Sequence, residues 1–320
     1  MSNYFFIKEF VDSKFSSGVG IDHEAIAKEF KNVLSEKFDN DTFIDLLIYS
    51  GYIPDLYDND SSEETLFTKL VEVLVAEWAD RMGFSSKIIK QKSSKEDICI
   101  TINDKRIVCD AKSFRLGRSQ KAPNAKDFLK LEDIRKWMNN YKNAIGGLVT
   151  YPCTHEWSDN SDVYSYCSTK DAPTVMLPYK YLSFALKYKN RFKSEGFLKL
   201  WDYSKIFPSK LEKNMPGGNK KAYWEAMNKS FISVTKTTTN EFNEFMETAN
   251  QKIIECVKAN LALLICKKNK IIEKIEHEIS QETNIDKLKK LILDYKIANE
   301  TGELDKLIER INLFRLPQKD

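Results

Sequence analysis

The pattern of hydrophobic and polar positions changes its period along the chain, and it begins as a helical pattern. Apolar residues recur every three or four positions through 21–38, 42–49 and 66–82, which is the spacing of amphipathic helices. Asp22 and the pair Ser61–Ser62 are suited to cap two of these segments, and Gly51 is a plausible stop for the other. Residues 1–83 are therefore predicted to form a helical N-terminal part.

Near residue 98 the pattern becomes that of strands. Ile98, Ile100 and Ile102 alternate with other residues, and a second apolar run at 107–109 follows a polar turn at 103–106. The two runs predict a β-hairpin. Residues 84–190 are predicted to be an α/β core with the following further segments: a loop at 113–126, helices at 127–141 and 178–188, and strands at 148–151 and 174–177.

From residue 240 onward the pattern is helical and highly charged. One apolar stripe runs from Phe242 to Val257, and further helical runs cover 271–279 and 288–311. The stretch 215–221 contains Pro216, Gly217 and Gly218 and is predicted to be a flexible link. We expect a single domain over 1–320, whose part from 191 to 320 is mostly helical.

Composition narrows the class of protein without identifying it. Hydrophobic residues make up 42% and charged residues 30%, a balance typical of globular chains. No signal peptide or membrane-spanning run is evident, so we expect a cytoplasmic protein that does not bind membranes. Three widely spaced histidines and six cysteines without a C-x-x-C pair argue against a zinc site, and Cys99 and Cys109 are expected to be buried.

The triplet Asp110-Ala111-Lys112 carries the candidate chemistry. Residues two apart on a strand project from the same face, so Asp110 and Lys112 are expected to share one site. Asp97 opens the preceding strand, and folding of the hairpin can bring it near Asp110. Hydrolysis of a phosphodiester needs an activated water and neutralisation of the developing charge, which carboxylates holding magnesium can supply together with a lysine.

The triplet alone is weak evidence, because the same acid-x-Lys pattern occurs in three predicted helices, at Asp12/Lys14, Glu29/Lys31 and Asp294/Lys296. A surface ion pair is the alternative interpretation. However, six basic residues and one acid lie between Lys112 and Lys130, while the whole chain carries a net charge of only +3. Such a concentration is typical of phosphate contacts, although a solvated basic loop is also common. The predicted DNA contacts are Ser113, Arg115, Arg118, Lys121, Asn124 and Lys126.

The run from Asp110 to Arg118, together with Lys126-Asp127-Phe128, resembles the HindIII-type restriction endonucleases. Weaker similarity touches 66–69 and 206–208. The resemblance implies a PD-(D/E)xK core, which is a mixed sheet flanked by helices, here with helical additions at both ends. It also implies a homodimeric type II enzyme. Such an enzyme makes magnesium-dependent cuts in both strands of the palindrome AAGCTT, after the first A, and leaves 5′ overhangs.

By motif match, Asp110, Lys112 and Asp127 are the expected catalytic residues, with Asp110 and Asp127 holding Mg²⁺, for which Mn²⁺ can substitute. The family carries a glutamate where this chain has Lys90, so another acid must complete the site. Asp97 is our choice of metal ligand, with Glu96 and Glu77 as alternatives. The spacing from Asp110 to Asp127 is also slightly longer than in the family, near 122–124, which bears on the exact target.

The restriction interpretation implies two partners, double-stranded DNA and a cognate methyltransferase that modifies the same site. Two other functions remain open from the sequence. One is a structure-specific repair or recombination nuclease with the same fold, which would cut branched DNA and spare an intact plasmid. The other is a catalytically inactive protein that binds DNA without cleaving it.

Overall fold

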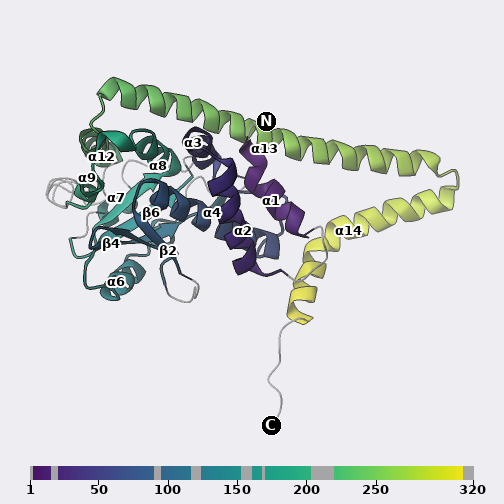
Figure 1. The fold of residues 1–320 in the computed structure, drawn as a ribbon. Coiled ribbons are helices and arrows are strands. Elements are labelled where there is room, and N and C mark those ends of the chain that lie inside the picture. The colour runs from purple at the N-terminus through teal and green to yellow at the C-terminus, as the bar shows by residue number, and fades with distance from the viewer. Residues whose placement is uncertain are drawn as a thin grey trace, which may run out of the picture. The chain divides into compact units, whose positions relative to one another are not determined.

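The computed structural model describes residues 3–15, 21–89, 95–116, 124–152, 161–167, 170–202 and 220–312 (Figure 1). Backbone contacts divide the chain into two compact units, 1–260 and 261–320. The first unit contains the predicted N-terminal helices and the predicted core, and the described part of the second, 261–312, is mostly helical. Each unit is described by itself.

The N-terminal helices form where the sequence predicts them. A short 3₁₀ turn at Asn3–Phe5 leads into α1 (Phe6–Phe15), and α2 (His23–Lys37), α3 (Asn40–Tyr49) and α4 (Ser62–Arg81) follow. The Asp22 side chain accepts hydrogen bonds from two backbone amides of α2, and Ser61 accepts one from the amide of Glu64. These bonds satisfy amide groups that a helix start leaves unpaired, and they confirm both predicted caps.

Helix α4 is buried along most of its length, including the charged side chains of Lys69, Glu72 and Glu77. Its Trp78 is fully buried and donates a hydrogen bond from the indole nitrogen to the carbonyl of Leu182 at 2.8 Å. A helix that is enclosed on all sides lies within the core, so α4 is the centre around which the first unit packs.

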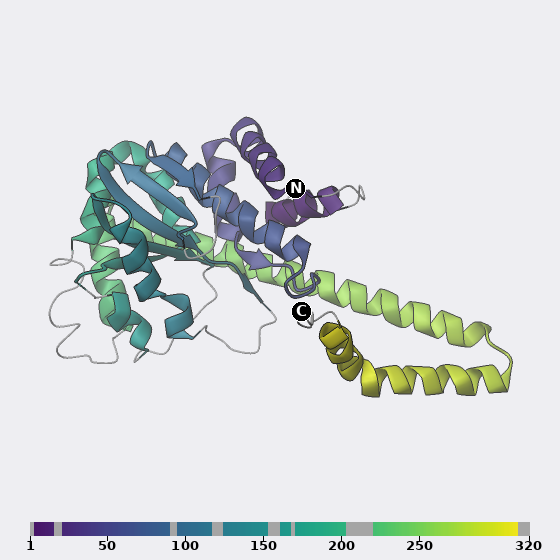
Figure 2. The same cartoon turned by 90° about the horizontal axis from the view of Figure 1, so that it is seen from below.

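The sheet is mixed and has five strands in the order β2-β3-β4-β6-β7. They are β2 (Ser85–Ile88), β3 (Ile98–Ile102), β4 (Lys105–Ala111), β6 (Ala144–Tyr151) and β7 (Thr174–Pro178). The pairs β2–β3 and β3–β4 are antiparallel, whereas β4–β6 and β6–β7 are parallel. Helices lie on both sides of the sheet (Figures 1 and 2), which confirms the mixed sheet flanked by helices that the resemblance implied.

The predicted hairpin is formed by β3 and β4, with Ile98 opposite Cys109. Its turn is shorter than predicted, because β4 already begins at Lys105. Asn103 in this turn has a φ of 55°, a left-handed conformation that asparagine tolerates better than most residues. Cys99 and Cys109 are buried, as predicted.

The connections differ from the prediction in two places. Two short helices, α5 (Ala125–Phe128) and α6 (Leu131–Asn139), replace one predicted helix over 127–141. The helix is interrupted where Phe128 and Leu129 turn into the core. A short strand, β5 (Phe114–Arg115), falls in the predicted loop and pairs in parallel with β1 (Tyr52–Ile53). Helix α7 (Asp162–Cys167) precedes β7, and α8 (Tyr179–Lys187) follows it directly, as predicted for that helix.

After α8 the chain forms three short helical turns, at Lys189–Arg191, Ser194–Phe197 and Leu198–Trp201, and then α12 (Lys220–Thr235). Residues 215–219 of the predicted flexible link lie outside the described residues, and Lys220 already belongs to α12. Helix α13 (Thr239–Gln281) buries Phe242, Phe245, Ala249 and Ile253, which confirms the first part of the predicted stripe. Helix α14 (Ile285–Asn312) follows it. None of the described helices has an apolar stretch sufficient to span a bilayer.

Candidate active site

Asp110 and Lys112 lie together at the carboxyl end of β4. Asp110 pairs with Val149 on β6, and the amide of Lys112 continues this pairing by donating to the carbonyl of Thr150 at 2.8 Å. Lys112 Nζ is 2.6 Å from Asp110 Oδ2, and the two side chains are only 16% and 10% exposed. The same-face arrangement predicted from strand geometry is therefore present, as a close and largely buried ion pair.

Asp97 joins this pair through the hairpin. Its amide donates to the carbonyl of Cys109 at 3.1 Å, and its Oδ2 accepts a hydrogen bond from the amide of Ala111 at 2.9 Å. Asp97 is thus held against the segment of β4 that carries Asp110. Burial raises the pKa of the Cys109 thiol well above its ordinary value, and the negative charges of Asp97 and Asp110 raise it further. A thiol with a raised pKa is a poor nucleophile, because the thiolate is the reactive form.

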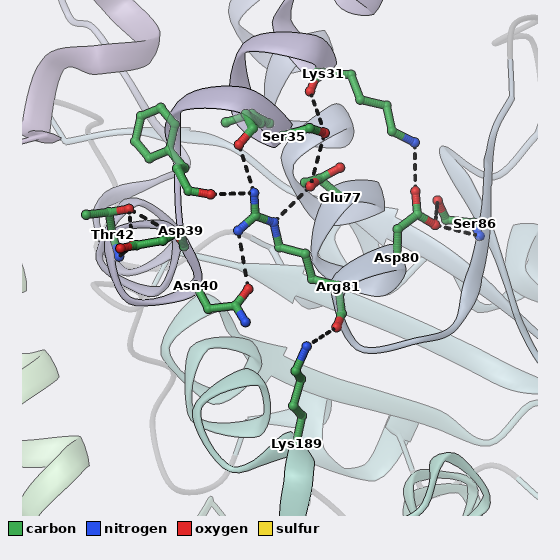
Figure 3. Close-up of polar contacts among 12 residues, drawn as sticks. Lys31, Ser35, Asp39, Asn40, Thr42, Glu77, Asp80, Arg81, Ser86 and Lys189 are labelled. Carbon is green, nitrogen blue, oxygen red and sulfur yellow. Dashed lines mark hydrogen bonds and ion pairs between the residues drawn. The ribbon is translucent and has the colours of Figure 1, made fainter.

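The two alternative upstream acids are engaged elsewhere. Glu77 Oε1 accepts a hydrogen bond from Arg81 Nε at 2.8 Å, and the same guanidinium also donates to the carbonyls of Leu34 and Phe38 (Figure 3). Glu96 accepts a short hydrogen bond from the hydroxyl of Tyr141. Among the three acids that the sequence left open, Asp97 is the one whose contacts place it beside β4 at Asp110.

Asp127 is in a different environment from Asp97, Asp110 and Lys112. It is exposed on the four-residue helix α5, where Asn124 caps the first turn by accepting a hydrogen bond from the amide of Lys126 at 3.0 Å. Within the part of the chain that the structure describes, no three His, Cys, Asp or Glu side chains form a group that could hold a metal. The metal-binding role of Asp127 therefore stays a prediction.

The pair Asp97 and Asp110 nevertheless fits a magnesium ion by its donor chemistry. Mg²⁺ prefers oxygen ligands, and proteins commonly bind it through one or two carboxylates, with water and substrate phosphate completing the shell. Both side chains supply carboxylate oxygens, on neighbouring segments of one hairpin. Manganese has similar ligand preferences, so the same pair suits it.

Tyr179 is a part of the site that sequence reasoning missed. Its hydroxyl donates a hydrogen bond to the carbonyl of Lys112 at 2.8 Å and so fixes the backbone beside the ion pair. Burial raises the pKa of Tyr179 well above its ordinary value, which keeps the hydroxyl a donor. Gly51 packs against this ring, because a Cβ at Gly51 would lie 2.6 Å from Tyr179 Cε2. With a φ of +87°, Gly51 also adopts a conformation that other residues rarely take.

The predicted DNA contacts have different environments. Arg115 is 16% exposed, and its guanidinium binds Glu64 at 2.9 Å and the carbonyl of Tyr57 at 2.7 Å, so it anchors β5 near the start of α4. The hydroxyl of Ser113 is buried without a hydrogen-bond partner among the described residues. Asn124 and Lys126 are exposed. Arg118 and Lys121 lie outside the described residues.

Comparison with known proteins gives two matches. Residues 7–299 match the family model described as HindIII restriction endonuclease. The chain is also similar to the type II restriction enzyme HindIII of Haemophilus influenzae (strain ATCC 51907 / DSM 11121 / KW20 / Rd), with 24% identity over 217 residues. That alignment covers 66% of this chain and 68% of the relative. The family match includes Asp97, Asp110, Lys112 and Asp127, so it covers the whole of the candidate site.

Proposed function

Because the chain belongs to the HindIII restriction endonuclease family, we propose that it is a type II enzyme that makes magnesium-dependent cuts in both strands of a short palindrome. The single observation that carries the proposal is the buried Asp110–Lys112 pair with Asp97 held beside it. The nine-residue run from Asp110 to Arg118, which resembles the HindIII-type enzymes, supports AAGCTT as the target and 5′ overhangs as the product.

Each residue of the site has a proposed role. Asp97 and Asp110 hold Mg²⁺, or Mn²⁺ in its place, and Asp127 on α5 supplies a further carboxylate when DNA is bound. The metal, when bound, would lower the pKa of the attacking water and offset negative charge on the phosphate. The ammonium of Lys112 orients that water and adds positive charge beside the phosphate, while Tyr179 keeps the backbone of Lys112 in place.

DNA is held by the segment that follows the catalytic strand. Lys126 is exposed, and with Arg118 and Lys121 it would contact phosphates. Asn124 is exposed and offers a polar group to phosphates or base edges, whereas a DNA contact by Ser113 requires its buried hydroxyl, which makes no hydrogen bond within the described residues, to become exposed. The support for this assignment is the density of positive charge between Lys112 and Lys130.

Cleavage of both strands of a palindrome suits a homodimer, because each chain contributes one Asp110–Lys112 site and a twofold axis relates the two strands. A restriction enzyme also implies a methyltransferase that protects the same sequence in the host's own DNA. We therefore propose a homodimer that acts on cytoplasmic DNA and has a cognate methyltransferase as its functional partner.

Digestion of an unmethylated plasmid of known sequence tests the proposal. Purified protein with magnesium should give discrete fragments, and EDTA should prevent them. Sequencing of the fragment ends then tests AAGCTT and the 5′ overhang directly. An intact plasmid alongside measurable DNA binding would indicate the inactive binding protein, and cleavage restricted to branched DNA would indicate a repair nuclease.

A further inference from the structure

A buried carboxylate that the proposed mechanism does not use directly precedes Asp97. Glu96 is only 3% exposed, and glutamate is seldom buried without a partner for its charge and its oxygen atoms. Its Oε1 accepts a short hydrogen bond from the hydroxyl of Tyr141, a residue 45 positions further along the chain. The bond therefore ties the segment before β3 to the connection between α6 and β6.

Tyr141 is itself held in place by its backbone and by its ring. Its amide donates a hydrogen bond to the carbonyl of Met138 at 3.0 Å, and its carbonyl accepts one from the amide of Ala144 at 3.3 Å. The guanidinium of Arg106, on β4, lies 4.8 Å from the centre of the ring, an arrangement in which the cation and the ring attract each other. The hydroxyl that reaches Glu96 is thus carried by a restrained side chain.

The hydroxyl of Tyr141 stays a donor at neutral pH. Burial raises the pKa of Tyr141 above its ordinary value, and the hydrogen bond to Glu96 raises it further. The thiol of Cys99 lies within hydrogen-bonding reach of the same hydroxyl, and burial raises the pKa of this thiol, so it brings no second negative charge. A hydrogen bond from a neutral hydroxyl to a carboxylate depends on direction as well as distance, so it can fix a side chain in one place.

The backbone connects this bond to the proposed metal ligand. The amide of Asp97 donates to the carbonyl of Cys109, and its carbonyl accepts from the amide of Ile89 at 2.9 Å, so the residue is held by β4 on one side and by the end of β2 on the other. Its Oδ2 accepts from the amide of Ala111, which orients the rest of the carboxylate. With Glu96 also fixed, the backbone is restrained on both sides of the peptide bond that leads into Asp97.

We propose that the hydrogen bond between Tyr141 and Glu96 positions the carboxylate of Asp97 for the metal. Neither Tyr141 nor Glu96 touches the metal or the phosphate, and both act through the backbone that joins residues 96 and 97. The inference deepens the proposed function, on which it rests, because it concerns the same metal site. Loss of a group that holds a metal ligand in place commonly lowers metal affinity by roughly tenfold to a hundredfold.

Binding of Mn²⁺ to the full chain without DNA, measured by electron paramagnetic resonance of the free ion, tests the inference. Tyr141→Phe removes only the hydroxyl and should raise the dissociation constant roughly tenfold. Glu96→Met removes the acceptor and should do the same. The double variant should show the increase of one single variant, because both residues act through one bond. Glu96→Gln keeps an acceptor oxygen and should bind Mn²⁺ almost as the wild type does.

Tyr57→Phe is a matched control, because the hydroxyl of Tyr57 also donates to a carboxylate, that of Asp12 on α1, at 2.8 Å. It should leave the Mn²⁺ dissociation constant unchanged, even where urea denaturation shows a loss of stability. An unchanged constant in Tyr141→Phe, or effects of the two site variants that multiply, would overturn the proposal. If Tyr141→Phe does not fold, Tyr141→Phe/Glu96→Met carries the same test, since it leaves no unpaired carboxylate.

Plasmid digestion separates this inference from the proposed function. Tyr141→Phe should need roughly tenfold more magnesium for half-maximal cleavage and approach the wild-type rate at saturation, as expected when only binding is weakened. Chains that bind Mn²⁺ as described but do not cut would contradict the nuclease proposal and support the positioning role. A nuclease in which Tyr141→Phe changes neither the Mn²⁺ constant nor the magnesium requirement would overturn that role alone. A wild type that binds no Mn²⁺ would also overturn it.

Discussion

Two buried acid–lysine pairs invite comparison. On α4, Lys69 Nζ lies 3.4 Å from Glu72 Oε2, and both side chains are 5% exposed. At the end of β4, Lys112 Nζ lies 2.6 Å from Asp110 Oδ2, with side chains that are slightly more exposed. The chemical groups are the same in both places, and both pairs are withdrawn from bulk water.

The surroundings of the two pairs differ, although the negative charge of Glu72 contributes, with those of Asp97 and Asp110, to the raised pKa values of Cys109 and Tyr179 beside the β4 pair. Lys69 is also 3.8 Å from Glu24 at the start of α2, so the pair on α4 is enclosed between helices of the core. The pair on β4 stands where the strand ends, beside Asp97 and directly before the basic segment. Burial of an ion pair alone does not indicate catalysis. The proposed catalytic role of the β4 pair is supported instead by its position at a strand end, with a second carboxylate beside it and a basic segment directly after it.

The largest effect is expected at the β4 pair. Lys112→Ala should lower the cleavage rate by roughly a hundredfold to ten-thousandfold, because it removes the group proposed to orient the attacking water. Binding of uncleaved DNA in the presence of calcium should change little. Lys105→Ala is a matched control, since Lys105 begins the same strand, is more exposed and pairs only with the neighbouring Asp104 among the described residues. A Lys112→Ala enzyme that cuts at the wild-type rate would remove Lys112 from the mechanism.

The next largest effect is expected at the acid that completes the site upstream of Asp110. Asp97→Asn should reduce cleavage strongly and make it require more magnesium, because a metal-binding carboxylate is lost. Glu96→Gln should leave the magnesium requirement unchanged, since Glu96 is bonded to Tyr141. Titration of the cleavage rate with MgCl₂ measures both. If Glu96→Gln shifts the titration and Asp97→Asn does not, the assignment of Asp97 is wrong.

Local pattern explains why the β4 pair could be predicted from sequence. The acid-x-Lys pairs at Asp12/Lys14, Glu29/Lys31 and Asp294/Lys296 lie on α1, α2 and α14, where residues two apart point in different directions. Only Asp110 and Lys112 follow a short apolar strand in a predicted hairpin that has an acid at its start. Helices α2, α3 and α4, with the N-caps of α2 and α4, were predictable for the same reason, since apolar spacing and capping residues are local.

Features that depend on distant contacts could not be predicted. The bond from Tyr179 to the carbonyl of Lys112 joins residues 67 positions apart, and no local pattern indicates it. Strand β2 has the sequence Ser-Ser-Lys-Ile, which carries a single apolar residue and gains its pairing only from β3. The burial of Lys69 and Glu72 likewise follows from the helices packed around α4, and charged residues are normally expected outside.

A smaller effect, on stability, is expected at the α4 pair. Glu72→Gln should lower the free energy of unfolding by about 3 kcal/mol, because it leaves the charge of Lys69 poorly compensated in the core. The double variant Lys69→Met/Glu72→Leu removes both charges and should recover most of that loss. Urea denaturation measures each change, and cleavage below the transition should be near normal. A loss of cleavage without loss of stability would show that the α4 pair acts on the site, and the two pairs would then not differ in role as described.

The smallest effects distinguish an internal arginine from a DNA contact. Arg115 was predicted to bind DNA, yet its guanidinium binds Glu64 and backbone carbonyls. Arg115→Ala should therefore lower the free energy of unfolding by about 2 kcal/mol and leave the salt dependence of DNA binding unchanged. Lys126→Ala should do the reverse and reduce the slope of log affinity against log salt by about one, as the loss of one phosphate contact requires. If Arg115→Ala also reduces that slope, then Arg115 must leave its internal partners when DNA binds, and the segment after Lys112 rearranges around the substrate.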